Sequence, residues 1–506
     1  MEVTLQRESI GLFRKLADTC FNHEETMELI VPDTLPDVLD IVDTDGTVLL
    51  RSKEADIGKI TVSGVVRTHI IFVPEGGRGL RNLTVQIPIS ATVDGNEFTP
   101  STKLFVKAEL ASIDTRIINS RKLIARADVM FSISAYSEAE LQVSTGIADD
   151  TEIEVLKTNA EINPIVEVKE KVFSFSDEQS FSSSKPPIGA ILKSSVRLAA
   201  EDLKTVGSKL IIKGNAYISV IYTSSGSGEI IPNDFTVPFS QIMELNEESE
   251  NTAFSVGIMP TGIYIQESTE GTAGSHGISV EIAAVSQLIV WKKMNIQYIA
   301  DAYSTAWETN CTRSENSVNS LVSENTIRDN VRGTISTPNQ VRTVVGSRIF
   351  PGRVRQDENG YKVVLNAAAL YLTEEGKIML ASDIFEIPFG SETDQGTETA
   401  AELNINEAFV SPAAGGVELR IPVELKLREY ANIIIEPLSG IELDEEKQKD
   451  SAGMPSVVLC RVGANDSLWS LAKRYNSTRE LIKKANLKEE GDEISPNELL
   501  IIAKKR

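Results

Sequence analysis

Apolar residues alternate with other residues, at a period of two, along much of residues 1–441. Residues 123–129, 280–285 and 417–423 show the pattern clearly, and many of their apolar positions hold Val or Ile. Alternation of this kind is typical of strands with one buried face, and β-branched residues favour strands. Glycines and short polar clusters, for example at residues 76–79, separate the alternating segments. The pattern therefore predicts a mainly β body.

This body repeats itself with a period close to 150 residues. Corresponding phrases lie 150 positions apart in two copies and recur, more loosely, in a third: residues 59–64, 209–214 and 362–367, and residues 87–89, 237–239 and 387–389. A fixed internal period indicates that each copy is one structural unit. The alternating pattern predicts a β-sandwich or a related two-layer β domain for each copy. A Pro-x-Val/Ile phrase near the start of a copy, such as residues 36–42, is predicted to be a turn or one short helix.

The repeats and the polar segments divide the chain. We expect three tandem β-sandwich-like repeats at residues 1–150, 151–307 and 308–441, arranged like beads on a string. Residues 442–455 are rich in charged side chains, a composition typical of a flexible tether. Residues 456–506 then form a small separate module.

The spacing of apolar residues becomes helical in this last module. One predicted helical face carries Leu468, Leu471, Ala472 and Tyr475, and a second helix over residues 478–486 carries Leu481, Ile482 and Ala485. Asp466 or Ser467 can cap the first helix, and Asn476 can end it in a left-handed conformation. Short apolar runs before and after the helices predict one strand on each side. The expected order is β-α-α-β.

Composition narrows the possible partners. The 506 residues carry a formal charge of −23, which argues against nucleic acid and anionic membrane surfaces. Residues 456–506 hold ten basic and seven acidic residues, a balance of +3 that leaves −26 for the rest. The mildly basic charge of this tail is compatible with an acidic partner and equally with a solvated surface that binds no partner. No apolar run has the length of a transmembrane segment, and residues 1–14 have no hydrophobic signal core, so we expect a protein that starts in a cytoplasm.

Residues for common catalytic chemistry are not grouped along the chain. His23, His69 and His276 have no metal-ligand spacing, and Cys20, Cys311 and Cys460 lie far apart, which fits a reducing compartment. Neither a Gly-x-Ser-x-Gly elbow nor a phosphate loop occurs. We therefore predict a non-enzymatic protein with no metal and no cofactor. A glycan hydrolase, which needs two carboxylates across a cleft, remains a third hypothesis because sequence spacing does not test it.

The β-α-α-β module resembles LysM, a small domain that usually binds the N-acetylated sugars of peptidoglycan or chitin. The resemblance implies a shallow groove between the first turn and the loop before the last strand, with candidate residues Gly463, Asn465, Asp466, Ser467, Leu468, Ile494 and Pro496. Backbone groups and short polar side chains suit acetamido sugars. Ala464 and Asn465 stand where LysM modules usually have Pro-Gly, a departure compatible with a protein ligand. The helical spacing of Trp469 and Tyr475 favours core packing over sugar stacking.

Four phrases of the body resemble the SPOCS domain: residues 35–42, 59–64, 118–123 and 301–305. Tandem SPOCS-like domains followed by one LysM module resemble the family of SpoIVA-interacting, SipL-like proteins of spore coats. The resemblance implies a non-enzymatic morphogenetic scaffold in the mother-cell cytoplasm and at the forespore surface. It also implies a SpoIVA-like coat ATPase as partner, with the LysM-like module docking either that protein or an N-acetyl glycan. The alternative is a peptidoglycan-binding, lectin-like protein of the cell wall.

Overall fold

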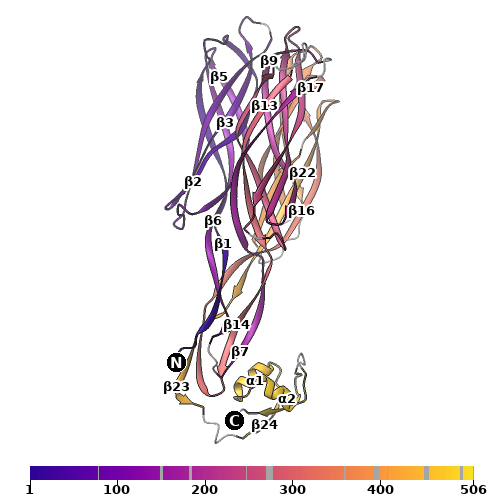
Figure 1. The fold of residues 1–506 in the computed structure, drawn as a ribbon. Helices are drawn as coiled ribbons and strands as arrows, with labels where there is room; N and C mark the ends of the chain where they lie inside the picture. Colours follow the sequence, from indigo (N-terminus) through magenta and orange to yellow (C-terminus); the bar gives the residue numbers. More distant parts are fainter. Residues whose placement is uncertain are drawn as a thin grey trace.

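The computed structural model describes the residues in the ranges 1–77, 79–148, 152–181, 185–246, 248–268, 277–357, 360–390, 398–406, 408–449, 455–489 and 494–504. The chain is elongated (Figure 1). Many strands gather at one end, which we call the head, and a few long strands continue from it into a narrower stalk. Two short helices lie beside the far end of the stalk, the foot, where both termini are also found.

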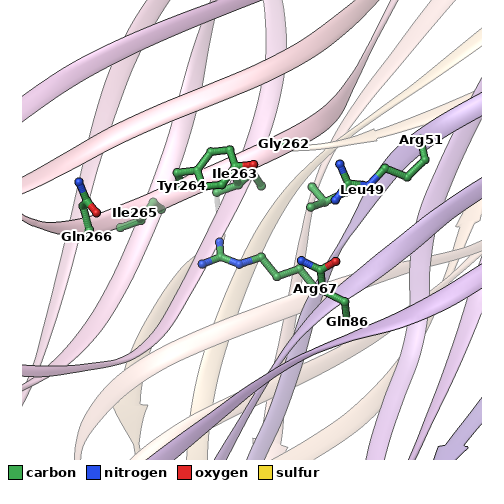
Figure 2. A pocket seen from close by; sticks show the side chains of 9 residues that line it. All are labelled: Leu49, Arg51, Arg67, Gln86, Gly262, Ile263, Tyr264, Ile265 and Gln266. Carbon is green, nitrogen blue, oxygen red and sulfur yellow. The ribbon is translucent and has the colours of Figure 1, made fainter.

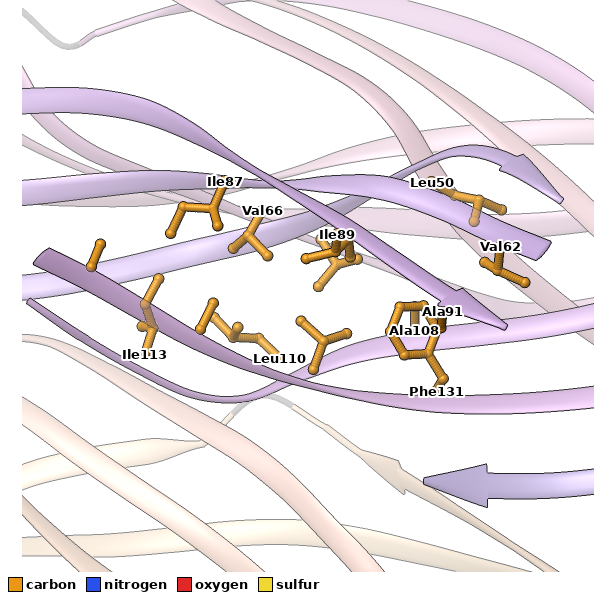
Figure 3. Close-up of a cluster of buried hydrophobic side chains, with 14 of the residues drawn as sticks. Leu50, Val62, Val66, Ile87, Ile89, Ala91, Ala108, Leu110, Ile113 and Phe131 are labelled. Atoms are coloured by element: carbon orange, nitrogen blue, oxygen red, sulfur yellow. The ribbon is translucent and has the colours of Figure 1, made fainter. Parts of the chain in front are cut away.

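Repeat 1 is a two-layer β domain, as its alternating pattern predicts. Its strands are β1 (Leu5–Ile30), β2 (Val38–Asp56), β3 (Lys59–Pro74), β4 (Arg81–Asp94), β5 (Lys103–Asn119) and β6 (Lys122–Ile147). The antiparallel sheet β2-β3-β4 packs on the layer that contains β1, β6 and β5. Figure 3 shows Val66 and Ile87 of the first layer facing Leu110 and Phe131 of the second. The mainly β fold is confirmed.

Repeats 2 and 3 follow the same order, except that the strands equivalent to β1 and β6 are each divided in two, as is the strand equivalent to β5 in repeat 3. Repeat 2 contains β7 (Ile153–Ile162), β8 (Ile165–Ser180), β9 (Ile188–Val206), β10 (Lys209–Ser224), β11 (Ile230–Glu244), β12 (Thr252–Ser268), β13 (Gly277–Lys292) and β14 (Met294–Ser304). Repeat 3 contains β15 (Trp307–Arg313), β16 (Asn316–Ser336), β17 (Val341–Asp357), β18 (Gly360–Thr373), β19 (Ile378–Phe389), β20 (Glu398–Ile405), β21 (Phe409–Ala413), β22 (Gly416–Ile435) and β23 (Leu438–Gln448). The three-stranded sheets β9-β10-β11 and β17-β18-β19 correspond to β2-β3-β4.

The phrase at residues 36–42 differs from its prediction. A turn precedes it, but β2 begins at Val38 and pairs with β3 from there on. Val38 is buried in the core of repeat 1. The proline thus ends the turn and the following apolar residues enter the sheet, with no helix between them.

The three repeats pack side by side, which corrects the expected string of beads. Sheet β12-β13-β8-β1-β6-β5 crosses from repeat 2 to repeat 1 through the pair Phe13 and Ile165. A shared core in the head takes Ile71, Ile221 and Leu370 from the middle strands of the three-stranded sheets of repeats 1, 2 and 3. Ile71 and Ile221 lie 150 positions apart, so equivalent positions of different repeats meet. The period visible in the sequence therefore describes three units around common cores.

The stalk is built from the ends of the same long strands. Its three two-stranded ribbons are the far part of β1 with β6, then β7 with β14, and β15 with β23. Apolar residues of all three repeats close its interior, among them Val143, Ile162 and Ile435. Nearer the foot, Val3, Ile299 and Ile441 form a second shared cluster. Each repeat therefore buries apolar surface in the head and again in the stalk.

The predicted tether at residues 442–455 starts too early. Strand β23 continues to Gln448 and pairs with β15, and the Leu443 N–H donates to the Met1 carbonyl at 2.8 Å. Ile441 and Leu443 are buried in the stalk, because apolar residues alternate within this charged stretch. Residues 450–454 of the expected tether lie outside the described residues, as does His276.

A cluster of charged side chains is buried where the repeats meet in the head. Lys193 of repeat 2 lies 3.2 Å from a carboxylate oxygen of Asp43 and 2.5 Å from one of Asp45, both of repeat 1. Arg348 of repeat 3 also pairs with Asp43. Burial opposes the charge on Lys193, but the two carboxylates outweigh it and raise the pKa of Lys193. Neighbouring His69 contacts Thr84 and, across the seam between repeats 1 and 2, Ser194.

Candidate functional site

The C-terminal module has the predicted β-α-α-β order. It consists of β24 (Val457–Arg461), α1 (Leu468–Arg474), α2 (Arg479–Ala485) and β25 (Leu499–Ala503). Ser467 is the N-cap of α1 and forms a capping box with Ser470, and Thr478 caps α2. Asn476 has a φ of 55° between the helices, as predicted from its tolerance of the left-handed region.

Asp466 does not cap the helix but closes the first loop. One carboxylate oxygen accepts the Gly463 N–H at 2.9 Å, and the other accepts from Arg474 at 2.7 Å. The Gly463 N–H and the Arg474 guanidinium hold the pKa of Asp466 below its usual value. Asp466 is therefore ionised at neutral pH and fixes the shape of the loop from within.

The two loops named by the groove prediction lie next to each other. Val462 donates its N–H to the Glu498 carbonyl at 2.9 Å and accepts the Asn497 N–H at 2.8 Å. These bonds continue the pairing of β24 and β25 beyond the strand ends. The fold thus brings the first turn and the loop before β25 to one edge of the module.

The seven predicted groove residues fall into two groups on this edge. Gly463, Asn465, Ser467 and Pro496 are exposed, and Asp466, Leu468 and Ile494 are half-buried. Leu468, the first residue of α1, and Ile494 of the loop before β25 pack against the core of the module. The arrangement offers backbone groups and short polar side chains above a small apolar floor. Ligand binding by these residues stays a prediction.

The module rests on the foot of the stalk, a contact that the sequence analysis did not anticipate. The Trp469 ring N–H donates to Asp301 at 2.8 Å, and Lys473 reaches the same carboxylate at 2.7 Å. Tyr303 stands edge-on to Trp469, with ring centroids 4.9 Å apart, and donates to the Ser477 carbonyl at 2.7 Å. We call these four side chains, with Arg479, the seat.

Arg479 completes the seat from the second helix. Its guanidinium lies 5.3 Å from the centre of the Trp469 ring and donates to the Val155 carbonyl at 3.1 Å. Both the core of the module and the stalk cover Trp469, so this residue is only 8 % exposed. This confirms its core packing and excludes it as a sugar-stacking surface in the seated module. The phrase at residues 301–305, singled out for its SPOCS resemblance, supplies the stalk side of the seat.

The residues that the structure describes, in the ranges given above, contain neither a metal-binding cluster nor a helix suited to span a membrane. In those ranges no group of three or more His, Cys, Asp or Glu side chains is placed to hold a metal ion. No helix in the same ranges is long and apolar enough to cross a membrane. Cys20, Cys311 and Cys460 are all free thiols.

Two family models match the chain. Residues 37–118, from the last turn before β2 to the end of β5, match the family described as SipL, SPOCS domain. Residues 460–503, from β24 to the end of β25, match the LysM domain. The chain combines a SipL-type SPOCS domain with a C-terminal LysM domain. This is the composition of a SipL-like sporulation protein that carries a module of the peptidoglycan-binding kind.

The SPOCS match covers part of repeat 1, and repeats 2 and 3 relate to it through their strand order and internal period. Both matched domains are binding domains without catalytic function. No curated protein and no solved structure matches the chain.

Proposed function

We propose that this protein is a non-enzymatic scaffold of the spore coat and envelope, whose LysM module docks a SpoIVA-like coat ATPase. The observation that carries the proposal is the position of the module. The seat holds its α1 face against the stalk, while Gly463, Asn465 and Pro496 remain exposed on the loops. A long body with a fixed module at one end is suited to joining two layers.

The choice of a protein ligand rests on the first loop. Ala464 and Asn465 replace the Pro-Gly pair usual in LysM modules, and Asp466 uses both carboxylate oxygens inside the protein. Less of the loop is then free to hydrogen-bond a sugar. An N-acetyl glycan of peptidoglycan is the second candidate ligand, favoured by the match to the LysM family and by the short polar residues at the edge.

Substitution of one exposed loop residue tests both ligands in the full chain. Asn465→Trp would place a bulky ring on an exposed position of the first loop, whereas Asn330→Trp puts the same ring on an exposed position of β16 in the body. We expect Asn465→Trp to reduce capture of the coat ATPase at least tenfold and Asn330→Trp to leave it unchanged. Unchanged capture by both variants would contradict docking through the loops.

Retention on purified peptidoglycan distinguishes the two ligands. Retention that Asn465→Trp abolishes, without capture of the ATPase, would favour the lectin-like alternative. A chain that ends at Lys449 is the appropriate truncation, because one that ends at Glu442 would remove half of β23. For localisation, we propose the mother-cell cytoplasm and the forespore surface. A diffuse fluorescent fusion throughout sporulation would contradict that part.

A further inference from the structure

A pocket opens at the seam between repeats 1 and 2, far along the chain from the LysM module. It has a volume of about 190 Å³. Leu49 and Arg51 of β2, Arg67 of β3 and Gln86 of β4 form one side, and the β12 residues Gly262–Gln266 form the other. Figure 2 shows the Arg67 side chain extending across the pocket toward Tyr264.

The polar lining consists of two guanidinium groups, two side-chain amides and one phenol, with no carboxylate. Arg51 donates to the Thr261 carbonyl at 3.3 Å. Among the residues that the structure describes, no Asp or Glu oxygen lies within 4.0 Å of either guanidinium, whereas buried Arg348 and Arg428 are both ion-paired. Exposed Arg51 and half-buried Arg67 thus line one pocket without a carboxylate partner.

The environment of Arg67 has an electrostatic consequence. Burial lowers its pKa, and no carboxylate reverses this effect. In Arg428, burial acts in the same direction, but Glu402 and Glu324 outweigh it and raise the pKa. The Arg67 charge is therefore partly desolvated and uncompensated, and an anion in the pocket would stabilise it.

Repeat 2 satisfies the equivalent positions internally. Glu201 and Tyr217 lie 150 residues after Arg51 and Arg67, and the Tyr217 hydroxyl donates to Glu201. On the middle strand of the corresponding sheet in repeat 3, Asn366 donates to the Ala111 carbonyl of repeat 1 at 3.1 Å, a hydrogen bond across that seam. The fold that the repeats share therefore does not require arginine at positions 51 and 67.

We propose that Arg51 and Arg67 form a binding site for a small anionic ligand, held through a carboxylate or phosphate group. A guanidinium presents its donors in a planar fork that matches either group. The amides of Gln86 and Gln266 can donate further hydrogen bonds, and Ile263, Ile265 and the Tyr264 ring offer contact to a small apolar body. This site is independent of the ligand of the LysM module.

Calorimetric titration of the full chain with inorganic phosphate and with succinate tests the proposal. The variants are Arg67→Gln and Arg51→Gln, and the control is Arg116→Gln, an exposed arginine of β5 paired with Asp114. We expect saturable binding of at least one anion, weakened tenfold or more by either pocket variant and unchanged by the control. Preference for phosphate or succinate identifies the recognised group, and both outcomes support the site.

Stability supplies a second readout. Because the Arg67 charge is uncompensated, Arg67→Gln should fold with an unchanged or higher melting temperature, and saturating ligand should raise the melting temperature of the native chain only. Absence of binding by both anions, or equal binding by Arg67→Gln and the native chain, would overturn the proposal. Binding of a glutamate-rich peptide, with neither small anion bound, would also overturn it in favour of a protein partner.

Discussion

The head and the foot of the molecule use different means to hold their parts together. In the head, three repeats share a core of equivalent apolar residues, and one buried cluster of Asp43, Asp45, Lys193 and Arg348 links them. At the foot, the LysM module meets the stalk through one aromatic pair, a few hydrogen bonds and an ion pair that is open to water. Buried area is the dominant stabilising term in proteins, so the head should open last.

The head also shows how similar repeats become distinct. Asp43 and Lys193 occupy equivalent positions 150 residues apart but carry opposite charges. Three identical copies would bring like charges together in a buried site, which is strongly unfavourable. The charge cluster therefore favours one order of the repeats around the shared core, while the apolar residues provide most of the stability.

Loss of the buried cation should have the largest effect. Lys193→Met leaves Asp45 buried beside Asp43 with Arg348 as the remaining cation, and we expect a loss of about 3–5 kcal/mol in the stability of the head. Denaturant unfolding followed by head-specific hydrogen exchange measures this loss. Lys209→Met, on an exposed position of β10, serves as control. Adding Asp45→Asn should recover part of the stability, and no recovery would contradict an electrostatic cause.

Removal of the stalk ring should release the foot and leave the head intact. Tyr303→Ala opens a cavity beside Trp469, at a cost of about 3–5 kcal/mol confined to the seat. Faster hydrogen exchange in α1, with unchanged exchange in β3 and β10, would show this separation. Tyr303→Phe keeps the ring but loses the hydrogen bond to the Ser477 carbonyl. We expect this loss to destabilise the seat by about 1 kcal/mol. If hydrogen exchange in β3 and β10 also became faster, the head and the foot would not be independent, which would contradict the comparison.

Acid should weaken the head through His69. Burial, reinforced by the Arg67 charge, lowers the pKa of His69 from 6.5 to about 4. The pKa of His69 is lower in the folded than in the unfolded protein. Its contribution to the free energy of unfolding is therefore complete above pH 6.5 and declines as the pH falls toward 4. We expect up to about 3 kcal/mol to be lost across this window. His69→Gln should flatten the pH dependence of stability, and His23→Gln is the matched control; equal slopes in native chain and His69→Gln would refute the assignment.

The smallest effect is expected at the ion pair of the seat. Asp301→Asn removes the attraction to Lys473 but keeps an oxygen for the Trp469 N–H, so about 1 kcal/mol or less should be lost. Burial raises the pKa of Asp301, but Lys473 and the Trp469 N–H outweigh burial and lower it. The native seat should therefore hold above about pH 4 and weaken as the pH falls further. Hydrogen exchange of α1 at pH 5 and pH 3 checks this, and a pH effect that persists in Asp301→Asn would argue against it.

Local patterns were sufficient for much of the fold. Period-two alternation located the strands because a half-buried strand must alternate, and Thr478 and Asn476 marked helix ends by the conformations that they favour. The internal period identified equivalent strands in all three repeats. The adjacent loops of the LysM module were expected from its resemblance to that domain, whereas the choice between Asp466 and Ser467 as helix cap needed the tertiary structure.

The sequence by itself determined the strands, the period and the LysM module, because each depends on neighbours within a few residues or on a repeated copy. Tertiary structure alone decided that the repeats share a core, that residues 442–448 complete the stalk, and that Trp469 meets Asp301 and Tyr303. It also placed Arg51 and Arg67 opposite β12 without a carboxylate. These features join residues more than a hundred positions apart, and no local pattern specifies which distant surfaces bury each other.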